Sequence, residues 1–225
     1  SMTVVLFDID GTLLRSDGAG RAATRAALIE VFGDAGSVDS HYFGGKTDWQ
    51  LVLEILTSLG HDPDDIARLM PVYGDVLARH MSREIGSGFR IGALPGALNA
   101  VNDLRARPDV LLGLITGNVQ NTVPIKLRAA GYDPDWFTVG AFGNESADRN
   151  HLAALALDRA RQAAGHTLDP QQVVVVGDTP ADVACARAIG ARAVAVTTGF
   201  ADHDQLAASA PDHLLDDLSS LTHLI

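Results

Sequence analysis

The sequence predicts an α/β fold: a doubly wound parallel sheet with an all-helical segment inserted after the first strand. Three observations support this prediction. Short apolar runs alternate with amphipathic helical patterns, polar turn-forming residues follow each run, and residues 16–92 show helical patterns only. The 225 residues, 47% of them hydrophobic and 20% charged, are enough for one α/β core with an insertion.

The strands are predicted from apolar runs that are too short to form helices. The first run spans residues 4–7 and leads directly into an acidic turn at residues 8–12. Runs of the same character follow at residues 110–115, 173–176 and 193–196, and a fifth strand is expected within residues 137–142. Because helices separate these runs, the strands should be parallel and covered on both faces. Ligands bind such sheets outside the carboxyl ends of the strands.

The helices are predicted from apolar residues at 3.6-residue spacing. Two such patterns lie in the core, at residues 98–104 and 152–163, and three lie in the insertion, at residues 21–32, 49–59 and 63–85. The last one begins well, because Asp62 supplies a capping carboxylate and Pro63 suits the first helical position, whereas Pro71 is expected to break or kink it. The chain therefore divides into an α/β core, residues 2–15 and 93–225, and a helical cap, residues 16–92.

The composition excludes several classes of protein. The net charge of −11 repels nucleic acid and anionic membrane surfaces, so neither is expected as a partner. No apolar run approaches the ~20 residues of a membrane span. The single cysteine, Cys185, excludes an internal disulfide, and no leader is evident in the sequence, so we expect a cytoplasmic protein. The preference for Arg over Lys is typical of a GC-rich bacterial genome.

The most informative residues are two carboxylates, Asp8 and Asp10, which follow the first strand and lead into Gly11. In a strand-to-turn geometry both side chains can face one site. Two negative charges at such a short distance are unfavourable unless a cation lies between them or one carboxylate takes a proton. The arrangement suits a nucleophile beside Mg2+ with an acid/base neighbour. The alternative is a solvated acidic loop without chemistry.

Three segments, in this order, resemble motifs of the haloacid dehalogenase superfamily in its phosphatase form. Residues 8–12 resemble the first motif, Thr116 after an apolar strand resembles the second, and residues 177–182 resemble the fourth. The resemblance covers the core from residue 4 to about residue 199 and implies a Rossmann-like core with a helical cap. It implies a hydrolase acting on phosphoric monoester bonds, similar to the phosphoglycolate phosphatase-like branch, because the dehalogenase and phosphonatase branches lack an acid at the position of Asp10.

The resemblance also implies a role for each acidic residue. Asp8 would attack phosphorus and form an aspartyl-phosphate, and Asp10 would protonate the leaving group and later deprotonate water. Mg2+ would be bound by the Asp8 carboxylate, the Asp10 backbone carbonyl and Asp178, with Asp182 as a weaker or outer ligand. The alternative for Asp182 is that it only favours the dipole of the helix in whose first turn it lies.

Thr116, together with the amides of Gly117 and Asn118, is implied to hold the phosphate oxygens. Proline is tolerated only in the first turn of a helix, and Pro124 would lie beyond that turn if the helix began directly after this loop. The regular helix is therefore expected to begin near residue 121 or 122. That start would leave both amides open to a ligand. The alternative is that Thr116 and Asn118 only cap the next helix.

The third motif departs from the family pattern. The family usually has Lys near the start of the helix before the fourth motif, where this chain offers Arg149. Arginine bridges carboxylate and phosphate oxygens, so we expect Arg149 to take the role. Lys126 is the rival cation, but its place inside a helical segment predicts a solvated face.

Substrate choice is expected to come from the insertion. Lys46 lies in a glycine-bearing loop before a helix and would meet the substrate's leaving group, through a carboxylate or a second phosphate. The alternative is that Thr47 or Asp48 caps that helix and Lys46 faces solvent. Arg15 and Arg21, near the hinge, are weaker candidates.

Together these features predict a Mg2+-dependent phosphatase that hydrolyses a small phosphorylated metabolite, a phosphoglycolate-like monoester, as a monomer or homodimer. A sugar phosphomutase of the β-phosphoglucomutase type shares Asp8 and Asp10 and is the closest alternative. From another class, a binding or regulatory protein would keep the fold without turnover.

Overall fold

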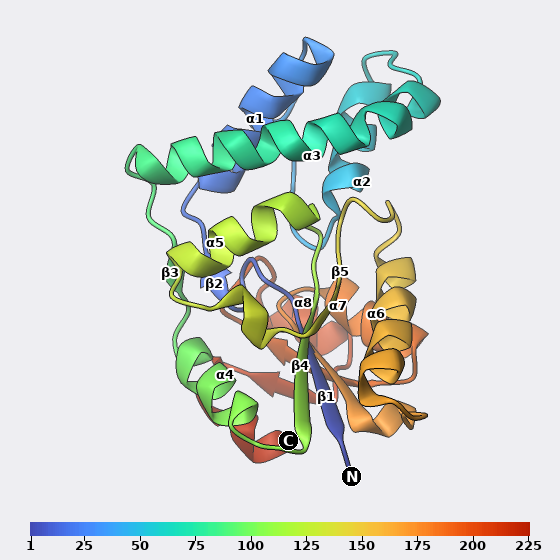
Figure 1. The fold of residues 1–225 in the computed structure, drawn as a ribbon. Helices are drawn as coiled ribbons and strands as arrows, with labels where there is room; N and C mark the ends of the chain where they lie inside the picture. The colour runs from blue at the N-terminus through green and yellow to red at the C-terminus, as the bar shows by residue number, and fades with distance from the viewer.

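The computed structural model describes residues 1–225 and contains a six-stranded sheet whose paired strands are all parallel. The strand order is β5-β4-β1-β6-β7-β8, so the chain winds outward from β1 in both directions (Figure 1). The strands are β1 Thr3–Phe7, β4 Val110–Ile115, β5 Val139–Ala141, β6 Val173–Gly177, β7 Arg192–Val196 and β8 His213–Leu215. The doubly wound sheet and the five strands expected from apolar runs are confirmed. The edge strand β8 was not predicted, because its three residues carry no apolar run.

Alternating side chains of β1 build one apolar core on each face of the sheet. Val5 and Phe7 belong to one buried cluster, and Val4 and Leu6 belong to the other. The helices that cover the two faces are α4 Ala97–Arg105, α5 Val123–Ala129, α6 Arg149–Ala164, α7 Pro180–Ala188 and α8 His203–Ala208. Three 3-10 helices lie in the connections between strands and helices, and a fourth follows β8: η1 Gln120–Thr122, η2 Pro134–Trp136, η3 Pro170–Gln172 and η4 Leu218–Leu224.

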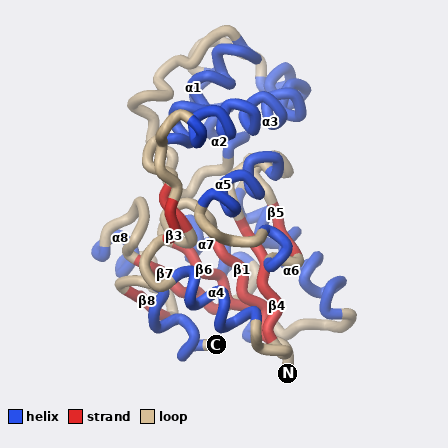
Figure 2. The backbone as a smooth tube through the Cα atoms, turned by 60° about the vertical axis from the view of Figure 1, so that its left-hand side comes forward, coloured by secondary structure: helices blue, strands red, loops and turns tan.

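The insertion leaves the core through a two-stranded antiparallel ribbon of β2 (Leu14–Arg15) and β3 (Gly92–Ala93). Between these strands the regular elements are all helices: α1 Ala19–Phe32, α2 Asp48–Thr57 and α3 Pro63–Gly86. Figures 1 and 2 show α1, α2 and α3 together beyond the carboxyl ends of the strands, far from both termini, with α5 between them and the sheet. None of the protein's helices combines the length and the apolar character needed to cross a bilayer.

Helix α3 begins as predicted and then continues past Pro71. The Asp62 carboxylate accepts the Asp64 N–H at 2.7 Å, and Pro63 takes the first position. The expected break at Pro71 is wrong. Proline has no N–H to donate to the Ala67 carbonyl. Both residues are exposed, so that carbonyl is not left buried without a partner.

Gly113 lies in β4 between β1 and β5, where a side chain has no room. A Cβ there would lie 2.6 Å from Val139 Cγ2 and 2.8 Å from both Leu6 Cδ2 and the Val139 carbonyl oxygen. We predict that Gly113→Ala lowers the free energy of unfolding by about 1–3 kcal/mol, because the sheet backbone must shift to admit the methyl group. Urea unfolding measures the change. Gly86→Ala is the control, since no atom lies within 4 Å of its added Cβ; equal midpoints for Gly113→Ala and wild type would contradict the prediction.

Candidate active site

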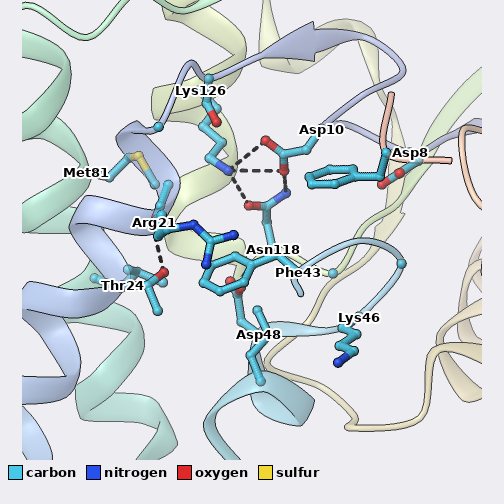
Figure 3. Close-up of a pocket in the computed structure, with 18 of the residues that line it drawn as sticks. Asp8, Asp10, Arg21, Thr24, Phe43, Lys46, Asp48, Met81, Asn118 and Lys126 are labelled. Atoms are coloured by element: carbon cyan, nitrogen blue, oxygen red, sulfur yellow. Dashed lines mark hydrogen bonds and ion pairs between the residues drawn. The ribbon is translucent and has the colours of Figure 1, made fainter. Parts of the chain in front are cut away.

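A cavity of about 210 Å³ lies between the carboxyl ends of the strands and the insertion. It is smaller than the ~300–1,000 Å³ of pockets that hold drug-sized ligands. Charged and polar side chains from both parts of the chain line it, and Figure 3 shows Asp8, Asp10, Asn118 and Lys126 from the core and Arg21, Lys46 and Asp48 from the insertion. Arg149 from the core and the apolar side chains of Phe43 and Met81 from the insertion also line it. The cavity therefore suits a small, charged molecule.

Asp8 is positioned by the end of β1 and by a sharp turn after it. Its N–H still donates to the Val176 carbonyl at 2.9 Å, so its backbone continues the sheet. Its carboxylate accepts the Ile9 N–H at 2.8 Å. Gly11 then adopts a φ of +82°, where a Cβ would lie 2.2 Å from Asp178 Oδ2. The chain turns back against Asp178 because residue 11 has no side chain.

Three buried carboxylates, Asp8, Asp178 and Asp182, each place an oxygen within 4.8 Å of the others. Arg149 Nη2 contacts Asp8 Oδ1 at 3.0 Å and Asp182 Oδ1 at 2.9 Å. Burial and the neighbouring Asp182 raise the pKa of Asp8 well above its usual range, although Arg149 opposes the shift. Burial, with Asp182 beside it, raises the pKa of Asp178 to about 6. One guanidinium therefore leaves the cluster short of positive charge.

The donor set of this cluster fits Mg2+, a hard cation that prefers carboxylate oxygens. Asp182 is the most heavily engaged of the three carboxylates. Its Oδ2 accepts the N–H groups of Asp178 and Thr179 and the Thr179 hydroxyl, each at 3.0 Å, so it caps α7. Asp182 thus caps the start of α7, where the sequence had suggested only an interaction with the helix dipole, and it also lies in the acidic cluster. Its part as a metal ligand stays a prediction.

Asp10 faces a lysine and an amide on its other side. Lys126 Nζ donates to Asp10 Oδ1 and Oδ2 at 3.0 and 3.1 Å and to Asn118 Oδ1 at 2.8 Å. Asn118 Nδ2 donates to Asp10 Oδ2 at 2.7 Å (Figure 3). The expectation that Lys126 is solvated is wrong, because its side chain is only 4% exposed. It shares a face of α5 with Val123 and Ala130, both buried, and that i−3, i+4 pattern is the sequence signal that would have identified it.

The loop after β4 folds back on itself through Thr116. The Thr116 hydroxyl oxygen accepts the Asn118 N–H at 3.0 Å and its Nδ2 at 2.8 Å. Neither residue caps a helix, since η1 begins after Val119 without a side-chain cap. The Asn118 amide is therefore already bonded within the loop, contrary to the expectation that it is open. Gly117 and Asn118 both line the cavity.

Arg149, the first residue of α6, lies where the third-motif cation was expected. It is buried beside Asp8 and Asp182, and Nη2 also donates to the Ile115 carbonyl at 3.3 Å. Its Nε is buried and has no hydrogen-bond partner in the protein. Arg149 also lines the cavity, so its guanidinium places a positive charge there.

Two cations of the insertion line the cavity. Lys46 Nζ pairs with Glu54 Oε1 at 2.7 Å, and Thr47 caps α2 by accepting the Gln50 N–H at 3.0 Å. Whether Lys46 also binds substrate stays a prediction. The Arg21 guanidinium lies 4.2 Å from the Phe43 ring centroid and donates to the His41 carbonyl at 2.8 Å. Arg21 therefore has a fixed place in the cavity wall.

Asp48 is a half-buried residue whose contacts with the core the sequence did not predict. Its N–H donates to the Gly117 carbonyl at 2.7 Å, and its Oδ2 accepts the Val119 N–H at 2.8 Å. Burial raises the pKa of Asp48 to about 6, although Lys126 opposes the shift. The insertion is thus bonded directly to the loop that carries Thr116 and Asn118.

Comparisons with known proteins agree with this arrangement. A sequence model of the haloacid dehalogenase-like hydrolases matches residues 5–187. The chain is 28% identical over 225 residues to phosphoglycolate phosphatase of Synechococcus elongatus, covering 100% of this chain and 97% of the relative. It is 27% identical to protein CbbY of Rhodobacter capsulatus, covering 97% and 95%. A hydrolase from Pseudomonas syringae, whose crystal structure is known, is 24% identical and shares the fold with a TM-score of 0.72 over 99% of this chain and 98% of that one.

We predict that Mg2+ raises the melting temperature more at about pH 7.5 than at about pH 5. The pKa of Asp178 is about 6 in the folded protein, above the ~3.9 of an unfolded aspartate. Folding therefore takes up a proton, and without metal the free energy of unfolding falls as the pH rises from about 4 to about 6. Above that range the ionised cluster binds the cation, which stabilises only the folded state.

Thermal unfolding with and without Mg2+ measures this effect. Asp178→Asn should lose most of the Mg2+-dependent rise, because it removes a carboxylate from the cluster. Asp65→Asn, which changes an exposed carboxylate on α3, should keep it. Equal rises in wild type and Asp178→Asn would contradict the assignment.

Proposed function

The chain belongs to the haloacid dehalogenase-like hydrolase family, and on this basis we propose that it is a Mg2+-dependent phosphatase for a small phosphomonoester. One observation carries the proposal most directly: the Asp8 carboxylate lies at the cavity beside Asp178, Asp182 and the Arg149 guanidinium. A nucleophile, a cation-binding cluster and a fixed positive charge thus meet at one point. Phosphoryl transfer depends mainly on such positioning and charge.

In the proposed reaction an Asp8 oxygen attacks phosphorus. The new bond is an aspartyl-phosphate, and the bond between phosphorus and the leaving oxygen breaks. Asp10 gives its proton to that oxygen and later takes a proton from the water that attacks the intermediate. Inorganic phosphate leaves and the Asp8 carboxylate is restored. Asp8, Asp178 and Asp182 would hold Mg2+, which when bound would supply positive charge to stabilise the negative charge of the phosphoryl group.

The phosphoryl group would be held by groups from the loop after β4 and from the start of α6. Arg149 would contact its oxygens, because it lines the cavity and its guanidinium lies beside Asp8. Gly117 lines the same cavity and would offer its amide, and the hydrogen bonds of Asn118 to Thr116 and Asp10 fix the loop that carries it. Donors placed this way stabilise the charge that spreads over the phosphoryl oxygens.

The insertion would act as a cap that selects the substrate. The cavity of about 210 Å³ favours a small leaving group, and Arg21 and Lys46 in its wall favour one with a negative charge. A phosphorylated short hydroxy acid such as phosphoglycolate has both properties. Relatives named phosphoglycolate phosphatase support this substrate class.

A phosphomutase remains an outcome that the substrate test detects. With a hexose 1-phosphate, a mutase yields an isomeric sugar phosphate, whereas a phosphatase releases inorganic phosphate and free sugar. Chromatography of the products separates the two. A binding protein on this fold would yield neither.

We predict that Asp8→Asn abolishes phosphate release from phosphoglycolate in the presence of Mg2+ while the protein stays folded. The amide is a poor nucleophile, and it nearly matches the carboxylate in shape. Released phosphate measures activity, and circular dichroism measures folding. Turnover by Asp8→Asn at the wild-type rate would refute the proposed nucleophile.

We predict that Asp10→Asn lowers kcat/KM for phosphoglycolate by about 10²- to 10⁴-fold. The loss for p-nitrophenyl phosphate should be much smaller, because p-nitrophenolate leaves without a proton. Steady-state kinetics with both substrates gives the comparison. An unchanged rate with phosphoglycolate would show that Asp10 is not the acid.

A further inference from the structure

Lys126 is a buried lysine that the proposed reaction does not use. Its ammonium has three hydrogens and three acceptors: both Asp10 carboxylate oxygens and Asn118 Oδ1, at 2.8 to 3.1 Å. Burying an ammonium is costly unless it is fully paired. The chain has only one other lysine, and Asp8 already has its own cation in Arg149. The position of Lys126 therefore calls for a function of its own.

The three side chains form a closed ring of hydrogen bonds. Asn118 Nδ2 donates to Asp10 Oδ2 at 2.7 Å and to the Thr116 hydroxyl oxygen at 2.8 Å, while Asn118 Oδ1 accepts from Lys126. Contacts to both Asp10 oxygens fix the rotation of the carboxyl group as well as its place. The Asp10 side chain is 26% exposed and lines the cavity, so these hydrogen bonds add to the packing that holds it in place.

We propose that Lys126 is a positioning residue that holds the Asp10 carboxyl group in line with the leaving oxygen of the substrate. This role rests on the proposed function, because it acts through Asp10. The two catalytic carboxylates then have one cation each: Arg149, from α6, contacts Asp8, and Lys126, from α5, contacts Asp10. Removing either cation should affect a different half of the reaction. Loss of the Arg149 charge slows attack on phosphorus for every substrate, whereas loss of Lys126 slows only the steps that need Asp10.

The test uses two substrates with different needs for a proton. Lys126→Met keeps the length of the buried stem and removes the ammonium. For phosphoglycolate, whose leaving oxygen needs a proton, kcat/KM should fall about 10- to 100-fold, the cost of misplacing a reacting group by about an ångström. For p-nitrophenyl phosphate the fall should stay below about threefold, which also shows that the variant is folded. Lys126→Arg should recover part of the phosphoglycolate activity.

Two further variants separate positioning from a general structural role. Arg128→Met removes an exposed charge from the same helix and should leave both substrates unaffected. In the Asp10→Asn background, Lys126→Met should lower kcat/KM for phosphoglycolate only slightly further, because Lys126 acts through the Asp10 carboxyl group and that group is already absent. Equal losses for both substrates, or losses that multiply in the double variant, would overturn the positioning role. Wild-type protein with Mg2+ that hydrolyses neither substrate would instead refute the proposed function.

Discussion

The structure depends on a charge balance that water does not screen: three buried carboxylates, Asp8, Asp178 and Asp182, share the single guanidinium of Arg149. The raised pKa values of Asp8 and Asp178 show that the folded protein holds these charges at a cost. Hydrogen bonds from the start of α7 to Asp182 offset part of that cost. The negative charge that Arg149 does not neutralise would attract a cation. The same excess charge lowers the stability of the metal-free protein and makes the cluster suitable for Mg2+.

The sheet brings these charges together because its order places β1 between β4 and β6. Asp8, Thr116 and Asp178 each follow one of these strands, and parallel strands end at the same edge. Two glycines then allow close approach: a Cβ on Gly11 or Gly199 would lie 2.2 or 1.9 Å from Asp178 Oδ2. The site is therefore a consequence of topology together with two positions that admit no side chain.

This is why the strand-end residues could be predicted from the sequence and other residues could not. Because apolar runs alternate with helices, the strands are parallel, and the residues that directly follow them lie together at the carboxyl ends of the sheet. Lys126 was assigned to solvent because a charged residue inside a helical segment usually faces water. Its buried apolar neighbours Val123 and Ala130 are the local signal that it faces inward, but its partners Asp10 and Asn118 come from other segments of the chain. Asp48 meets Val119 only when the insertion lies on the core, and no local pattern encodes a contact between residues so far apart in sequence.

That contact connects the insertion, to which we assign substrate choice, with the residues proposed to carry out the chemistry. Asp48 bonds to Gly117 and Val119, the two neighbours of Asn118, and the Asn118 side chain orients Asp10. A displacement of the insertion therefore moves the loop that sets the position of the proposed proton donor. The hydrogen bonds that join the insertion to this loop therefore link the wall of the cavity to the orientation of Asp10.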